Sequence, residues 1–151
     1  MNSTLAIIKP DAVGAGLAGK VLAHLENAGF KIRALRMLQL TEAQAQAFYA
    51  VHRERPFYGS LVKFMTSGPV IPVALEAANA VTTLREVIGA TDPAEAAAGT
   101  VRKLYAESKE RNAIHASDSA ENAVAEIAFF FATADVPGTG GMPRAAPETS
   151  V

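Results

Sequence analysis

The sequence contains no cysteine, and this absence removes several kinds of chemistry at once. A thiol nucleophile, a disulfide framework and a cysteine-ligated metal site are all excluded. The three histidines, His24, His52 and His115, show no paired spacing, so a zinc site is not predicted either. A covalent mechanism would therefore need a nucleophile other than a thiol.

The chain also lacks an excess of charge and a long apolar run. Its 14 basic and 15 acidic residues give a net charge of -1, which argues against a dedicated nucleic-acid or polybasic membrane protein. No apolar segment approaches the roughly 20 residues of a membrane span, and we read no signal peptide at the N-terminus. With 151 residues, half of them hydrophobic, the sequence predicts one cytoplasmic globular domain.

The hydrophobic pattern predicts alternating strands and helices. Strands are expected at residues 4–8, 30–40, 70–75 and around Ile114, and helices at 17–28, 41–51, 57–67, 79–88, 94–98 and 120–131. The run at 4–8 is apolar throughout, which predicts a central strand buried on both sides. Pro72 predicts a bulge or an unpaired position in the third strand. This order favours an antiparallel sheet with helices on one face.

The composition changes after Asp135. Residues 136–151 hold three prolines and three glycines but no aromatic residue. Such a segment is predicted to be a flexible tail without a role in the core, which leaves residues 1–135 as the domain.

Residues 14–19, GAGLAG, match the dinucleotide-binding fingerprint GxGxxG after a predicted strand and at the start of a helix. Five residues separate that strand from the first glycine, Glu42 begins a helix rather than ending a strand, and parallel strands do not alternate with helices later in the chain. A flexible glycine loop is the preferred interpretation. Dinucleotide binding stays as an alternative that a nicotinamide-cofactor binding test would settle.

The stretch NAIHASDS at residues 112–119 places His115 among small and polar residues just before a helical pattern. An imidazole is a nucleophile near neutral pH, and guanidinium groups with neutral donors would neutralise a transferring phosphoryl group. Such groups lie upstream at Arg85, Thr91, Arg102 and Asn112. The alternative is that His115 is structural and that the arginines are solvated on helix surfaces.

Three further features point to an anionic or nucleotide ligand. Lys9 ends a buried strand, where an unpaired lysine is rare, so a phosphate or carboxylate partner is expected. Thr100 before Arg102 indicates a helix N-terminus, which is a natural anion site. Phe57 belongs to the core or stacks on a nucleobase. His24 and His52 are interpreted as exposed.

Taken together, these residues resemble nucleoside diphosphate kinase over roughly residues 3–131. The matching pieces are IIKPDAV (7–13), FYAVH (48–52), RPFY (55–58), SGP (67–69), GATDP (89–93), GTVR (99–102) and NAIHASD (112–118). The number and order of these matches make the resemblance specific.

The resemblance implies an α/β fold of ferredoxin-like type, in which a four-stranded antiparallel sheet is covered by helices. It implies a ping-pong reaction in which ATP or another nucleoside triphosphate phosphorylates His115, which then phosphorylates a nucleoside diphosphate. By position, phosphates, sugar or the reacting centre would be contacted by Lys9, Tyr49, Arg85, Thr91, Arg102 and Asn112, with Phe57 on the base and Glu126 and Ser117 behind His115. It further implies Mg²⁺ held mainly by nucleotide phosphates, and a homo-oligomer, hexameric or tetrameric.

The chain departs from the family pattern at a few positions. Ala116 stands where glycine most often follows the histidine, and Asp92 replaces an asparagine, which would weaken nucleotide binding slightly. Neither change removes a reacting group, so activity is expected. The alternative is a catalytically weak, nucleotide-binding regulatory protein of the same fold.

Overall fold

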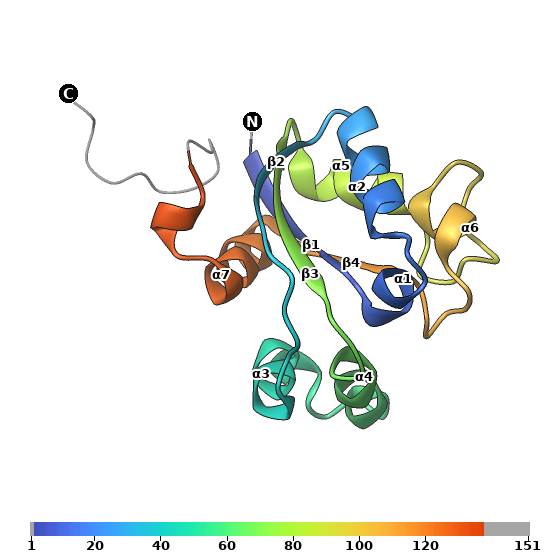
Figure 1. Cartoon of the computed structure of the whole chain (residues 1–151), viewed down its shortest axis with the longest axis vertical. Coiled ribbons are helices and arrows are strands. Elements are labelled where there is room, and N and C mark those ends of the chain that lie inside the picture. The colour runs from blue at the N-terminus through green and yellow to red at the C-terminus, as the bar shows by residue number, and fades with distance from the viewer. Residues whose placement is uncertain (1, 138–151) are drawn as a thin grey trace.

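The computed structural model describes residues 2–137, which form a four-stranded sheet flanked by helices (Figure 1). The strands are β1 (Asn2–Ile8), β2 (Lys31–Leu35), β3 (Ile71–Ala77) and β4 (Ile114–Ala116). They lie in the order β2-β3-β1-β4, and each neighbouring pair is antiparallel. The antiparallel sheet predicted from the sequence is therefore confirmed.

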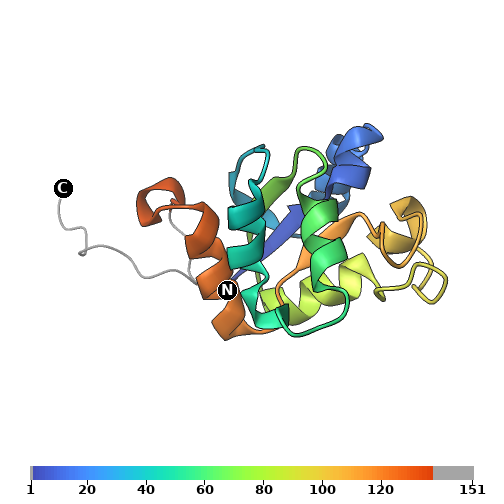
Figure 2. The same ribbon diagram turned by 90° about the horizontal axis from the view of Figure 1, so that it is seen from below.

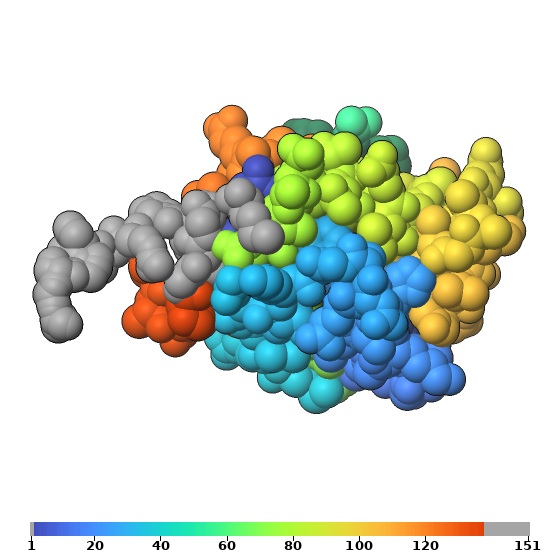
Figure 3. Space-filling view, turned by 90° about the horizontal axis from the view of Figure 1, so that it is seen from above, coloured from blue at the N-terminus to red at the C-terminus, as the bar shows by residue number. Residues whose placement is uncertain are grey.

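The helices divide between the two faces of the sheet. They are α1 (Pro10–Gly14), α2 (Ala18–Asn27), α3 (Glu42–Phe48), α4 (Tyr58–Met65), α5 (Ala80–Ile88), α6 (Val101–Tyr105) and α7 (Ala120–Phe130), with short 3-10 turns at Ala50–His52 and Thr133–Asp135. One core cluster joins the sheet to α1, α2, α5 and α6, and the second joins it to α3, α4 and α7. Figure 2 shows α3 and α4 side by side on one face, and Figure 3 shows α2 in blue beside α5 in yellow-green on the other.

The expectation that helices cover one face is thus wrong, and β1 gives the reason. Leu5 and Ile7 point into the cluster with α3, α4 and α7, whereas Ala6 and Ile8 point into the other cluster. A strand without a polar position needs cover on both sides. Burial of β1 on both sides, predicted from its unbroken apolar run, is confirmed.

The glycine motif at 14–19 does not form a dinucleotide site. The short helix α1, which the sequence pattern did not reveal, follows β1 and ends at Gly14, the first glycine of the motif. A dinucleotide turn needs glycine because backbone and helix pack closely there, yet a Cβ at Gly14, Gly16 or Gly19 would meet no neighbouring atom within 4 Å. With an antiparallel sheet as well, the dinucleotide alternative is overturned.

Pro72 is paired without a bulge, contrary to expectation. It lies opposite Ile7 in the continuous β1–β3 register, and its carbonyl accepts a hydrogen bond from the Arg36 backbone N–H at 3.3 Å. The register shift falls instead in β2, between Ile32 and Ala34. β2 also ends earlier than predicted, at Leu35, and an isolated bridge between Leu38 and Val70 lies beyond it.

The ends of the helices follow their capping residues. Thr41 and Gln44 form the predicted capping box at the start of α3, and Ser119 caps α7 by accepting a hydrogen bond from the Asn122 backbone N–H. The helix expected at 94–98 is a series of turns.

The C-terminal part of the described chain differs from the sequence interpretation in two ways. The sequence pattern predicts that the core-facing stripe of α7 consists of Ala120, Ala123, Val124, Ile127, Ala128 and Phe131. In the structure Val124 is 46% exposed, whereas Phe130 is buried together with Ala123 and Ile127. Val136 is buried in the cluster of α3, α4 and α7, so the expectation that it has no core role is wrong. The rest of the predicted tail, residues 138–151, lies outside the described residues.

Candidate active site

The pairing of β4 with β1 decides which way His115 points. His115 lies opposite Ile7, and directly opposed residues of an antiparallel pair share one face of the sheet. Because Ile7 faces the cluster of α3, α4 and α7, His115 projects toward these helices, while Ile114 and Ala116 fill the other core. The imidazole side chain is 18% exposed, so it is reachable from solvent but largely enclosed.

One nitrogen of the imidazole is held from behind by α7. His115 Nε2 lies 2.8 Å from Glu126 Oε1, and Ser117 Oγ donates to the same oxygen at 2.7 Å. A carboxylate oxygen only accepts, so Nε2 carries the hydrogen of this bond. Among the described residues, Nδ1 has no hydrogen-bond partner. Burial lowers the pKa of His115 despite the opposing effect of Glu126, so the ring is neutral at neutral pH.

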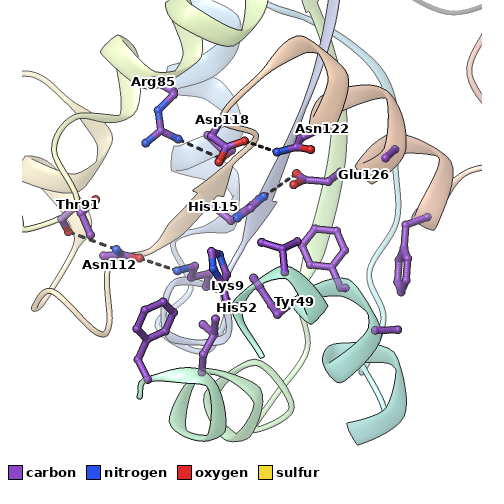
Figure 4. A pocket seen from close by; sticks show the side chains of 18 of the residues that line it. Lys9, Tyr49, His52, Arg85, Thr91, Asn112, His115, Asp118, Asn122 and Glu126 are labelled. Carbon is purple, nitrogen blue, oxygen red and sulfur yellow. Dashed lines mark hydrogen bonds and ion pairs between the residues drawn. The ribbon is translucent and has the colours of Figure 1, made fainter. Parts of the chain in front are cut away.

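A second row of polar groups lies beside the histidine. Lys9 Nζ donates to Asn112 Oδ1 at 2.8 Å, and Asn112 Nδ2 donates to the Thr91 carbonyl at 3.3 Å. Figure 4 shows these three residues in line on the side of His115 away from Glu126. Burial, with the nearby positive charge of Arg102, lowers the pKa of Lys9 to about 8. This ammonium group would gain from an anionic partner.

Arg102 is the second residue of α6, whose N-terminus Thr100 caps. Its guanidinium donates to three backbone carbonyls, those of Gly89 at 3.0 Å, Asn112 at 3.3 Å and Ile114 at 2.7 Å. A guanidinium has five N–H groups, so two remain for a ligand. Burial and the charge of Arg85 lower the pKa of Arg102 to about 10.

The turn before His115 is unusual. Ala113 has a φ of 74°, and the Ile114 N–H bonds to the Asn112 carbonyl at 2.9 Å, which closes a three-residue γ-turn of the rarer hand. Asp11 Oδ2 accepts from the Ala113 N–H at 3.0 Å and the Lys9 N–H donates to the Ala113 carbonyl at 2.9 Å. Asp11, to which we had assigned no role, therefore fixes the backbone that carries Asn112 and His115.

These groups line one cavity of about 570 Å³. Of the residues predicted for the site, its wall contains Lys9, Tyr49, Phe57, Arg85, Thr91, Arg102, Asn112, His115 and Glu126. Ser117 is fully buried behind the wall, where it reaches the cavity only through Glu126. Phe57 is 47% exposed at the cavity, so it is not a core residue. The Arg85 guanidinium donates to the Ala116 carbonyl at 3.3 Å.

Two aromatic side chains stand next to the imidazole. Tyr49 is buried with its ring 6.1 Å from that of His115, and its hydroxyl has no hydrogen-bond partner within residues 2–137. Burial, and the negative charge of Glu126, raise the pKa of Tyr49, so its hydroxyl remains a donor. Phe48, the last residue of α3, contacts the other rings of this region as well.

Sequence reasoning missed three polar residues of the cavity wall, together with the apolar part of the wall to which Phe48 belongs. His52, interpreted as exposed, is half-buried, with its ring stacked on that of Tyr49 at 6.5 Å and tilted against that of Phe57 at 5.4 Å. Asp118 and Asn122 line the wall and are joined by a hydrogen bond of 2.7 Å. The i, i+4 spacing of Asn122 and Glu126 on α7 was the available signal for Asn122.

The two departures from the family pattern are accommodated. Ala116 ends β4 opposite Ala6 and has no positive φ, since the left-handed position is Ala113. The methyl group of Ala116 packs in the core. The Asp92 carboxylate accepts from the Ala94 N–H at 2.9 Å and is not part of the cavity wall.

Within residues 2–137, no group of three or more histidine, aspartate or glutamate side chains is placed to hold a metal ion. No helix in this part of the chain has the length and apolar character needed to cross a membrane.

Known proteins resemble this chain along most of its length. The family model described as nucleoside diphosphate kinase matches residues 2–136. Nucleoside diphosphate kinases of Chlorobium chlorochromatii and Gluconobacter oxydans are 60% and 58% identical over 136 residues, which is 90% of this chain and 97% of each relative.

Solved structures of nucleoside diphosphate kinases also superpose on this chain. The nucleoside diphosphate kinase of Aquifex aeolicus superposes with a TM-score of 0.88 at 46% identity, covering 89% of this chain and 98% of that one. The Halobacterium salinarum enzyme, solved in complex with CDP, gives 0.86 at 37% identity and covers 91% of both chains. With His115, its supporting carboxylate and the surrounding cations in one cavity, this chain belongs to the nucleoside diphosphate kinase family.

Proposed function

We propose that this enzyme moves the γ-phosphoryl group of ATP or another nucleoside triphosphate to a nucleoside diphosphate, with His115 as the covalent carrier. The observation that carries the proposal is the supported imidazole. His115 is neutral, held at Nε2 by Glu126, and placed in one cavity with Lys9, Arg85 and Arg102. A neutral nucleophile surrounded by fixed cations suits attack on a polyanion.

The hydrogen bond to Glu126 selects the reacting nitrogen. Since Nε2 carries a hydrogen, the free lone pair belongs to Nδ1. In the first half-reaction Nδ1 bonds to the γ-phosphorus as the bond to the β-phosphate oxygen breaks, and the diphosphate leaves. In the second, a terminal oxygen of another diphosphate attacks that phosphorus and the N–P bond breaks. Glu126 stabilises the positive charge that the ring gains in between.

The remaining predicted residues would bind the nucleotide. Lys9, Arg85 and the two unused N–H groups of Arg102 would neutralise phosphate charge, and the unpartnered Tyr49 hydroxyl would donate to the ligand. Asn112 positions Lys9, and its turn is fixed by Asp11. The remaining contacts would come from Thr91 beside Asn112 and from Phe57, whose exposed ring would stack on the base without reading its edge.

Mg²⁺ would arrive on the nucleotide. The cavity offers no cluster of protein ligands in the described residues, and its carboxylates are already engaged, Asp118 by Asn122 and Glu126 by His115 and Ser117. This donor set fits an ion coordinated mainly by phosphate oxygens. When bound, Mg²⁺ supplies additional neutralisation of the phosphate charge.

We also propose a homo-oligomer, hexameric or tetrameric, in the cytoplasm. Support for association comes from the sheet edge formed by β2. Leu35, its last residue, is 48% exposed, and Met37, which lies just beyond the strand, is 60% exposed. Apolar side chains at an open strand edge favour burial against another copy.

Covalent labelling tests the proposed reaction. Purified protein incubated with γ-labelled ATP and Mg²⁺, without acceptor, is expected to acquire an acid-labile, base-stable label of the kind formed on histidine. Added GDP or CDP should discharge this label into the corresponding triphosphate, and a chelator should prevent labelling. Nucleotide binding without any label would overturn the proposal and leave a regulatory nucleotide-binding protein.

The pH dependence of kcat/KM for ATP should show the deprotonation of the Lys9 ammonium group. Its pKa of about 8 means that the free enzyme holds this cation below pH 8 and loses it above, so kcat/KM should fall on the alkaline side. On the acid side, activity should persist below the ordinary histidine pKa, because burial lowers the pKa of His115. Measuring kcat/KM from pH 5 to roughly pH 10 gives both the acid and the alkaline side of the profile. In Lys9→Arg the alkaline limb should move toward the pKa of Arg102, about 10; an unmoved limb would assign it to another group.

A further inference from the structure

We propose that Phe48 is a positioning residue whose ring sets the tilt of the His115 imidazole, an inference that rests on the proposed reaction at His115. Phe48 is half-buried at the end of α3 and lines the cavity. Its ring carries no group that could hydrogen-bond a phosphate or a sugar. Any effect of Phe48 on phosphoryl transfer must therefore pass through its neighbours.

Those neighbours form an aromatic cluster with the imidazole at one end. The Phe48 ring lies 5.5 Å from that of His115 at 72°, and 4.9 Å from that of Tyr49 at 84°. On α7, its neighbours are Phe129 at 5.3 Å and Phe130 at 5.2 Å. Among residues 2–137, Phe48 is the one ring that contacts both His115 and the phenylalanines of α7.

The hydrogen bond to Glu126 does not by itself fix the tilt of the His115 ring. It fixes the position of Nε2, but the terminal torsion of an imidazole has a broad profile, so one bond does not determine the tilt of the ring. An edge-to-face neighbour restricts that tilt, because rotation of the imidazole drives it into the neighbouring ring. Tyr49 adds a second restraint at the longer ring distance of 6.1 Å.

α7 supports both sides of this arrangement. Glu126 holds Nε2, and the Phe129 ring, 5.3 Å from that of Phe48, supports Phe48 beside the imidazole. The direction of Nδ1 is thus set by a carboxylate and a ring that rest on one helix. Because in-line attack tolerates little displacement, with a 1 Å error costing on the order of 10²-fold in rate, the loss of this ring should slow the chemical step.

The test compares two losses of a ring from the same cluster. Phe48→Leu removes the ring next to His115, whereas Phe130→Leu removes a buried ring that touches Phe48, but not His115, and is not in the cavity wall. The single-turnover rate of His115 labelling by γ-labelled ATP should fall about tenfold in Phe48→Leu. In the same variant KM for ATP should stay within about twofold of its original value. Phe130→Leu should lower Tm but keep the labelling rate, and Phe48→Tyr should restore most of that rate.

The outcomes separate this inference from the proposed function. If the unmodified protein and Phe130→Leu are labelled and Phe48→Leu is labelled at their rate, the positioning role is wrong and the proposed function stands. A rise in KM with an unchanged labelling rate would likewise overturn it, since Phe48 would then serve binding. If the unmodified protein takes up no label, both proposals fail together.

Discussion

We expect His115→Ala to lower kcat by at least about 10⁴-fold, the scale seen when a covalent nucleophile is removed. The remaining site would still bind nucleotide, because Lys9, Arg85 and Arg102 do not depend on the imidazole for their contacts. Glu126 would keep its hydrogen bond from Ser117, so no buried carboxylate is left without a partner. Steady-state turnover and ATP titration of the same sample measure the two properties.

A second histidine provides the control for this substitution. His24 lies on α2, outside the cavity wall, so His24→Ala removes an imidazole without touching the site. It should turn over at the original rate. Residual activity of His115→Ala within about tenfold of the original would mean that phosphoryl passes directly between nucleotides, or through another group.

Arg102→Met should damage both the stability and the activity of the enzyme. The substitution leaves the carbonyls of Gly89, Asn112 and Ile114 without their shared donor. The Asn112 carbonyl keeps its bond from the Ile114 N–H, but the carbonyls of Gly89 and Ile114 lose the guanidinium donor. This loss and that of three charge-assisted bonds should together cost about 3 kcal/mol of unfolding free energy. For a domain of this size this corresponds to a fall in Tm of about 10 °C. Loss of the positive charge should lower kcat/KM by about 10²-fold.

Arg85 separates these two effects. It faces the same cavity but is exposed and makes a single backbone hydrogen bond, to the Ala116 carbonyl at 3.3 Å. Arg85→Met should therefore lose activity with little change in Tm. Arg102→Lys should retain some activity but regain little stability, because an ammonium group cannot reach three carbonyls as the guanidinium fork does. An Arg102→Met protein that melts like the original would refute the structural role.

The sequence revealed those parts of the fold whose signal is local. The apolar run of β1, the Thr41–Gln44 capping box and the start of α7 at Ser119 each depend on a few adjacent residues, and each was confirmed. α1 was missed because five residues are too few to show a helical period. The helices on the second face of the sheet were missed because Pro72 and Glu76 interrupt the apolar pattern of β3. The sequence therefore does not show that β3 is buried along its entire length.

The site divides in the same way. Charged and nucleophilic side chains such as Lys9, His115 and Glu126 could be identified from sequence motifs, and all three line the same cavity in the structure. His52 could not, since its neighbours are charged and only a 3-10 turn carries it toward Tyr49. The part played by Asp11 depends on a hydrogen bond to a residue 102 positions away, which no local pattern reveals.

The place of β4 in the sheet bears on how the enzyme fails under stress. It is the shortest strand, three residues at the edge, with β1 as its one strand neighbour, and its ends are secured by single bonds from Lys9 to Ala113 and from Ser117 to Leu5. Segments with so few pairings open at lower free energy than a sheet's interior and exchange their amide hydrogens earlier. We therefore expect the amide hydrogens of β4 to exchange before those of the interior strands β1 and β3, and heating to displace His115 before those two strands separate.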